Sequence, residues 1–138
     1  MKTAKLKKIA KITSGSTAPK DNEFSIEGYP FIRVSHLDDL ISENSTLEMP
    51  KITLKIASKR KMKLSERDSI VFAKSGMSCL KNRVLKLKED SYIVNHLACI
   101  TVSSEIVNVD YLRYYLLWFK PSKLVIDESY PSIRLSDI

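Results

Sequence analysis

Residues 74–83 hold a dense group of side chains that can donate hydrogen bonds. They are Lys74, Ser75, Ser78, Lys81, Asn82 and Arg83. Ammonium, hydroxyl, amide and guanidinium groups suit phosphate oxygens and the edges of DNA bases. Asn82 and Arg83 can also pair bidentately with adenine or guanine, so we expect these two to discriminate sequence. The segment therefore predicts a DNA-contacting loop, although it also fits an ordinary surface loop on a lysine-rich protein.

Two further polar groups fit the same partner. Lys59, Arg60 and Lys61 are consecutive cations, and lysine's flexible point charge suits phosphates better than bases, so they are the predicted phosphate clamp. Asn95 and His96 stand between two apolar runs. Their amide and imidazole could read base edges or could satisfy backbone groups, and the sequence leaves both interpretations open.

The positive charge of the chain is concentrated in its middle. The net charge is +7, but residues 51–88 alone carry twelve basic residues against Glu66 and Asp68, an excess of +10. Such a block creates a local field that attracts polyanions, and nucleic acid is the commonest of these. The alternative is a basic face that is merely solvated.

The motifs of catalysis and of cofactor binding are missing from the sequence. With three glycines, neither GxGxxG nor a phosphate-binding P-loop can be written. No two prolines are adjacent, so the Asn-Pro-Pro-aromatic motif of amino-methylating DNA methyltransferases is absent. The acid-x-Lys pair of many metal-dependent nucleases is absent too, because no acid stands two residues before a lysine. The spacing of His36, Cys79, His96 and Cys99 is irregular for zinc. We expect no catalytic residues, no metal and no cofactor.

Length and composition indicate the compartment. At 138 residues the chain is long enough for one domain with a core. No apolar run approaches the roughly 20 residues of a membrane span, and the lysine-rich start does not fit a secretory signal. Two cysteines make no disulfide framework. We expect a cytoplasmic protein with no membrane partner.

The elements that must position these residues alternate between strands and short helices. Leu6, Ile9 and Ala10 have helical spacing, which predicts a short amphipathic helix over residues 3–12. Strands are expected at residues 31–34, 70–73, 84–88, 92–94, 97–102 and 133–135, and helices at 36–40, 53–61 and 109–120. In the predicted helix at 53–61, Leu54 and residues 56–57 should point inward.

The helix at 109–120 carries most of the aromatic side chains of the chain's second half. Asn108 is its predicted N-cap, and its sequence VDYLRYYLLWFK is apolar nearly all round. This pattern favours core packing or a docking face over a base-stacking platform. An alternative function is therefore a non-catalytic adaptor that docks another protein through helix 109–120.

An ordered series of short segments resembles a target-recognition domain of a type I restriction–modification specificity subunit. The segments are Leu6-x-x-Ile9-Ala10-x-Ile12-x-x-Gly15, Pro30-Phe31-Ile32-Arg33-Val34-Ser35-x-Leu37, Asp68-x-Ile70-Val71-Phe72-Ala73-Lys74-Ser75-Gly76, Val94-Asn95-His96-Leu97, Tyr111-Leu112-x-Tyr114-Tyr115-Leu116 and Ser132-Ile133-x-Leu135-Ser136-x-Ile138. No single motif carries the resemblance. It is carried by their order over essentially all 138 residues.

The resemblance implies a single α+β domain over residues 1–138, with a mixed or antiparallel twisted sheet flanked by short helices. It implies sequence-specific binding of double-stranded DNA without catalysis. In that family each such domain reads one half of a bipartite site for methyltransferase subunits, which modify adenine, and for a restriction subunit, which cleaves unmodified DNA. This chain ends where the family continues into a spacer helix. We therefore expect a fragment or half-subunit, for which self-association is conceivable.

Overall fold

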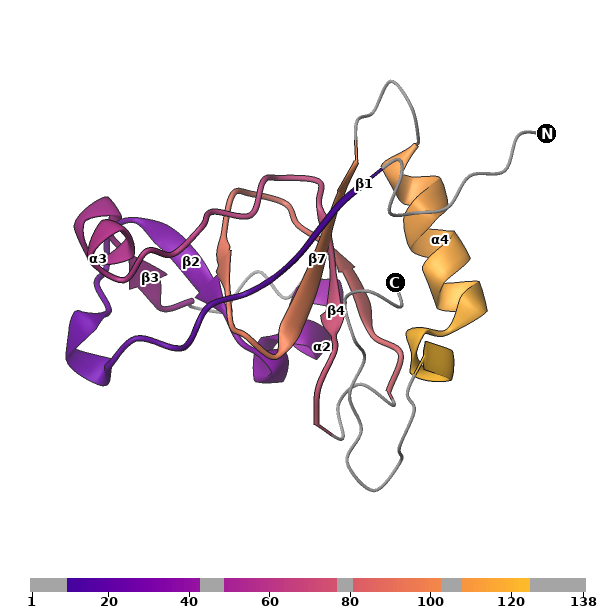
Figure 1. Ribbon diagram of the computed structural model, residues 1–138, viewed down its shortest axis with the longest axis horizontal. Helices are drawn as coiled ribbons and strands as arrows, with labels where there is room; N and C mark the ends of the chain where they lie inside the picture. The colour runs from indigo at the N-terminus through magenta and orange to yellow at the C-terminus, as the bar shows by residue number, and fades with distance from the viewer. Residues whose placement is uncertain (1–9, 43–48, 77–80, 103–107, 125–138) are drawn as a thin grey trace.

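The structure is a computed structural model that describes residues 10–42, 49–76, 81–102 and 108–124. Its strands form two sheets (Figure 1). The larger is antiparallel, in the order β1 (Ala10–Ser14), β7 (Leu97–Val102), β4 (Ile70–Ala73) and β5 (Val84–Lys86). In the smaller, β2 (Tyr29–Ile32) pairs antiparallel with β3 (Lys51–Ile52) and parallel with β6 (Tyr92–Ile93). Mixed sheets with few helices confirm the α+β class.

The core is built on the two central strands of the larger sheet. All four residues of β4 are buried, as are residues 97–100 of β7. Val71 lies opposite Cys99, and Phe72 lies opposite Ala98. Because both faces of these strands are covered, they read as continuous runs of apolar and mostly β-prone residues. This explains why the sequence predicted the bounds of both strands correctly.

The helices are short, apart from one. They are η1 (Asp21–Glu23), η2 (Val34–His36), α2 (Leu37–Ile41), α3 (Leu54–Lys59), α4 (Val109–Phe119) and η4 (Pro121–Leu124). The side chain of Asn108 accepts a hydrogen bond from the amide of Tyr111 at 3.0 Å, so the predicted N-cap of α4 is confirmed. In Figure 1, α3 with β2 and β3 lies at one end of the long axis and α4 lies at the other.

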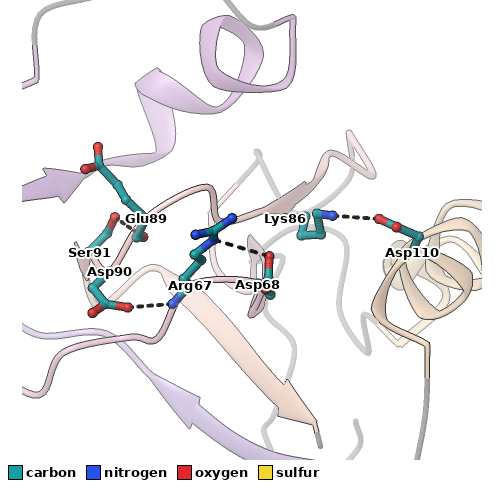
Figure 2. A network of polar contacts seen from close by, with 7 residues as sticks. All are labelled: Arg67, Asp68, Lys86, Glu89, Asp90, Ser91 and Asp110. Carbon is teal, nitrogen blue, oxygen red and sulfur yellow. Dashed lines mark hydrogen bonds and ion pairs between the residues drawn. The ribbon is translucent and has the colours of Figure 1, made fainter. Parts of the chain in front are cut away.

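Helix α4 is fastened to the edge of the larger sheet. Leu112 and Leu116 are its buried residues. The Nε of Arg113 donates to the carbonyl of Val84 at 3.2 Å, and Lys86 Nζ lies 2.8 Å from the carboxylate of Asp110 (Figure 2). These contacts fix which face of α4 meets the sheet and which face it turns outward.

Several sequence-based expectations need correction. Residues 10–12, predicted as the end of a helix, begin strand β1, because pairing with β7 from Ala10↔Val102 to Ser14↔Ala98 outweighs the helical spacing. The strand predicted at 31–34 lies at Tyr29–Ile32, and the chain turns into a 3-10 helix from Val34. Leu54, predicted to point inward, is 68% exposed.

Other expectations concern residues outside the described part. The predicted helix over residues 3–9 and the predicted strand at 133–135 both lie there. Among the described residues, none of the helices has the length and apolar character needed to cross a membrane.

Candidate nucleic-acid interface

A tight turn presents Asn95 and His96 to solvent. The amide of Leu97 donates to the carbonyl of Val94 at 3.0 Å, so the two polar residues are the central pair of a four-residue turn. Both are exposed, whereas Val94 and Leu97 on either side are buried. We refer to residues 94–97 as the presenting turn. Its flanks are anchored in the core, and only its polar side chains face outward.

Backbone hydrogen bonds from three other segments hold the presenting turn in place. β1 and β4 both run antiparallel to β7, so their carboxyl ends meet the start of β7 beside the turn. The bonds are Gly15 N to Leu97 O at 3.1 Å, Ser16 N to Ile93 O at 2.9 Å, Val94 N to Ile32 O at 2.9 Å, and Lys74 N to His96 O at 2.9 Å. A turn bonded on several sides has little freedom to move, so the directions of its side chains are largely preset.

Gly15 allows β1 to approach this closely. A Cβ atom on this residue would lie 2.1 Å from the carbonyl oxygen of Val94 and 2.3 Å from that of Ile93. These are backbone atoms, which cannot rotate away as a flexible side chain can. Any side chain at position 15 would therefore push β1 away from the turn.

The structure brings together four of the predicted site residues. The hydroxyl of Ser75 lies 2.7 Å from Nδ1 of His96, and the amide of the preceding Lys74 bonds the His96 carbonyl. Gly76 follows with a φ of 75°, a left-handed value that glycine adopts without a steric penalty. Lys74, Ser75, Asn95 and His96 therefore form one cluster at the end of the sheet.

Asn82 and Arg83 use their polar groups within the chain. The Oδ1 of Asn82 accepts a hydrogen bond from the amide of Ser122 at 2.8 Å, and Asn82 has a φ of 54°. Arg83 donates from Nη1 to Asp38 on α2 at 3.0 Å, and its side chain is 14% exposed. This placement does not favour base reading by these two residues, which stays a prediction. Lys81 is exposed, and Ser78 lies outside the described residues.

The predicted phosphate clamp lies on a different element. Lys59 is the last residue of α3, Arg60 is its C-cap, and Lys61 has a φ of 54°. Arg60 donates from Nε to the carboxylate of Glu23 at 2.9 Å and makes a second contact through Nη2. These contacts, with the hydrogen bond from the amide of Lys20, lower the pKa of Glu23 to about 2. Arg60 therefore has a partner, whereas Lys59 and Lys61 are exposed.

The arginines of the block at residues 51–88 differ in their contacts from two of its lysines. Arg60, Arg67 and Arg83 each lie within 4.0 Å of a carboxylate. Lys59 and Lys61, in contrast, make no ion pair with the residues that the structure describes. The planar guanidinium of arginine suits ion pairs of fixed geometry within the fold. The flexible ammonium of an exposed lysine remains available to an external anion. Lys59 and Lys61 therefore remain as external positive charge, whereas Lys86 of the same block is paired with Asp110.

Sequence reasoning missed the residues that support the presenting turn. Gly15 and Ser16 follow the helix that the sequence predicted over residues 3–12, and no local pattern connected them to residues 93–97. The signal was weak, because the bonds join segments about 80 residues apart in the chain. Gly15, one of only three glycines in the sequence, was the one hint of a close backbone approach.

Comparison with known proteins finds a relative by sequence. No protein-family model matches the sequence. The chain is 36% identical over 134 residues to the type I restriction enzyme MjaIX specificity subunit of Methanocaldococcus jannaschii. The match covers 94% of this chain and 30% of that subunit, so the chain spans less than a third of the relative's length.

Solved structures have the same fold. A chain from a study of complex assembly and conformational transition of the type I R-M system aligns with a TM-score of 0.65 and 16% identity, covering 96% of this chain and 30% of that one. The HsdS subunit from Thermoanaerobacter tengcongensis aligns with a TM-score of 0.64 and 16% identity, covering 97% of this chain and 33% of that one. The type I restriction–modification S subunit from M. genitalium aligns with a TM-score of 0.59 and 12% identity, covering 96% of this chain and 30% of that one. At these identities the alignments show only that the fold is shared. Together with the sequence relative, they confirm the resemblance to type I specificity subunits.

Proposed function

We propose that this chain is a target-recognition domain of a type I restriction–modification specificity subunit, and that it reads duplex DNA through Asn95 and His96. The observation that carries this proposal is the presenting turn, which holds two exposed side chains suited to base edges on a backbone bonded from three sides. The homology to a specificity subunit and the basic block at residues 51–88 support it independently.

The chemistry of the two side chains suggests a division of labour. The amide of Asn95 can accept from N6 and donate to N7 of adenine in the major groove. His96 can offer its Nε2, because its Nδ1 is engaged by Ser75. The half-buried Lys74 and the exposed Lys81 would contact phosphates and supply affinity without sequence preference.

The proposed role within a complex is recognition alone. The chain would read one half of a bipartite site, while separate methyltransferase subunits modify adenine and a restriction subunit cleaves unmodified DNA. It would need no cofactor, and its place of action would be the cytoplasm, where the DNA is. These partners are inferred from the class of protein to which the chain is homologous.

A selection experiment tests the DNA-reading proposal. The chain is incubated with duplexes that carry a randomised segment, and bound duplexes are sequenced over several rounds. We expect one short sequence to be enriched and bound at least tenfold more tightly than random duplex. A variant with Asn95→Ala and His96→Ala should lose this preference and keep its affinity for random duplex. Equal affinity of the unchanged chain for enriched and random duplexes would contradict the proposal.

Helix α4 supports a second function, contact with another protein of the complex. Tyr111, Tyr114, Tyr115 and Trp118 are 62%, 66%, 45% and 74% exposed. Large aromatic side chains exposed together along one helix are typical of protein interfaces. We propose that this face docks a methyltransferase subunit, which would make the adaptor interpretation complementary to DNA reading. Loss of that association on changing these side chains tests it.

A further inference from the structure

A pocket lies between η1 and α3, and none of the residues that line it belongs to the presenting turn. It has a volume of about 350 Å³. The residues that line it are Lys20, Asn22, Glu23, Ser25, Thr53, Ile56, Lys59 and Arg60. All but Ile56 have polar side chains, and three of them are cations against a single carboxylate. Such a lining disfavours an apolar ligand and favours an anion.

The one carboxylate in the pocket is already satisfied. Glu23 accepts the backbone amide of Lys20 at 3.0 Å and two contacts from the guanidinium of Arg60. Its side chain is 9% exposed, so its charge is covered by these partners. Glu23 and Arg60 thus neutralise each other and join η1 to α3 across 37 residues of sequence. The remaining charge of the pocket comes from Lys20 and Lys59.

The position of the pocket relative to the presenting turn is set by a short piece of chain. Ser16, which bonds the carbonyl of Ile93 beside the turn, precedes Lys20 by four residues. A fully extended chain of that length spans at most about 14 Å. The major groove of B-DNA is about 12 Å wide, so this upper limit is compatible with a duplex whose groove faces Asn95 and His96 and whose phosphate backbone reaches the pocket.

We propose that the pocket between η1 and α3 binds a phosphate of the DNA backbone through Lys20, Asn22 and Lys59. This inference rests on the proposed DNA-reading function and adds a contact site that lies outside the presenting turn. The two ammonium groups supply charge, and the amide of Asn22 supplies a directed donor. Glu23 and Arg60 are the supports of the pocket, and Arg60 is therefore not itself the phosphate contact.

The test compares lysines on the same helix. Lys55 is exposed on α3 but does not line the pocket, so Lys55→Ala removes the same charge as Lys59→Ala. Affinity for a random duplex is measured by fluorescence anisotropy between 50 and 200 mM salt. Each phosphate contact contributes about 0.9 to the slope of log affinity against log salt concentration. The Lys20→Ala, Lys59→Ala double variant should lose about one unit of slope, whereas Lys55→Ala should lose much less.

A second arm uses inorganic phosphate and does not depend on DNA binding. Addition of phosphate should shift the backbone amide signals of η1 and α3 in the unchanged chain, and not in the double variant. Phosphate shifts without any duplex affinity would sink the DNA-reading function and leave the anion site standing. A double variant with the same salt slope as Lys55→Ala, or unchanged amide signals on phosphate addition, would overturn the phosphate site.

Discussion

The imidazole of His96 is oriented by its neighbours before any ligand arrives. Its Nδ1 lies 2.7 Å from the Ser75 hydroxyl, and its carbonyl accepts the amide of Lys74. When Ser75 donates to Nδ1, the neutral ring carries its proton on Nε2. In the imidazolium, Nδ1 instead donates to the Ser75 hydroxyl, and Nε2 again carries a proton. In both forms Nε2 is a donor, which suits the N7 and O6 acceptors of guanine.

The first prediction concerns the serine that positions this ring. Ser75→Ala should reduce the preference for the selected duplex by up to about 1 kcal/mol, because one neutral hydrogen bond orients the ring. His96→Ala should reduce it by about 1–3 kcal/mol. Both are measured by competition between selected and random duplex. Ser75→Thr, which keeps the hydroxyl, should restore the preference, and the ¹⁵N signals of the His96 ring should change in Ser75→Ala alone. Equal weakening of both duplexes by Ser75→Ala would contradict a positioning role.

The other histidine gives stability a dependence on pH. Nδ1 of His36 accepts the backbone amide of Arg33 at 3.0 Å, and burial lowers the pKa of His36 below its ordinary value of 6.5, with Arg33 acting in the same direction and Asp39 opposing it. A lowered folded pKa means that the unfolded chain binds the proton more readily. The stabilisation is therefore present above pH 6.5 and is lost as the pH falls below it.

Urea unfolding at pH 7.5 and 5.5 checks this second prediction. His36→Asn keeps a side-chain acceptor and removes the titration. The free energy of unfolding of the unchanged chain should fall more between these pH values than that of His36→Asn. Equal decreases in the two proteins would show that His36 does not titrate with folding.

At the scale of elements, Gly15 and Ser16 at the end of β1 hold the presenting turn in place by backbone hydrogen bonds, and we call these two residues the brace. Gly15 and Ser16 continue β1 past its last residue paired with β7 and donate to the carbonyls of Leu97 and Ile93. Because the approach leaves no room for a Cβ atom, the brace depends on one glycine. The strand therefore stabilises the sheet through its ladder and organises the candidate site through its exit.

The third prediction compares two glycines. Gly15→Ala should destabilise the chain by about 3 kcal/mol, the upper part of the range for overpacked sites, because its Cβ would meet backbone oxygens. Gly76→Ala meets nothing within 4 Å and should cost about 1–2 kcal/mol for its left-handed backbone. Urea unfolding gives both values. The signals of Asn95 and His96 should shift strongly only in Gly15→Ala. A smaller loss of stability for Gly15→Ala than for Gly76→Ala would argue against the brace.

Local sequence predicted the central strands and failed at the edge strand. β4 and β7 are runs of buried, mostly β-prone residues, which are recognisable without their partners. β1 was read as helix because its pairing partner lies about 90 residues away, from Ala10 to Val102. The contacts within the candidate site could not be predicted from local sequence either. The types of Ser75 and His96 were noticed, but their mutual hydrogen bond depends on the pairing of β4 with β7.

Local sequence patterns also failed to predict the ion pairs. Arg60 was grouped with Lys59 and Lys61 by adjacency, yet its partner Glu23 lies in another segment of the chain. Arg83 likewise joins Asp38 on α2. A cluster of cations in sequence predicts the sign of the local field, but only the fold decides which of them are neutralised.

At the scale of the whole molecule, two surfaces of different chemistry lie far apart. The polar pocket is lined by η1 and α3, and α3 lies at one end of the long axis (Figure 1). The exposed aromatic side chains belong to α4 at the other end. The proposed DNA contact at the pocket and the proposed subunit contact on α4 would therefore not compete for the same surface. This separation makes the two proposed contacts independently testable.

The last prediction is that changes on α4 leave DNA binding intact. Tyr114→Ser with Trp118→Ser removes exposed aromatic area without touching Leu112 or Leu116, so the fold should persist. Aromatic side chains at the centre of an interface commonly cost 2 kcal/mol or more when truncated. We therefore expect association with the methyltransferase subunit to weaken at least about 30-fold, while affinity for duplex changes less than twofold.

Two measurements on one preparation decide the matter. Association is followed by sedimentation of the full specificity subunit with the methyltransferase subunit, and DNA affinity by anisotropy. Tyr29→Ser is the matched control, because Tyr29 is a 37% exposed tyrosine on β2, at the α3 end of the molecule. It should not alter association. If the α4 variant assembles as well as the unchanged protein, the aromatic face is not the docking surface. If it loses duplex affinity instead, α4 belongs to the DNA interface and the two ends of the molecule do not act separately.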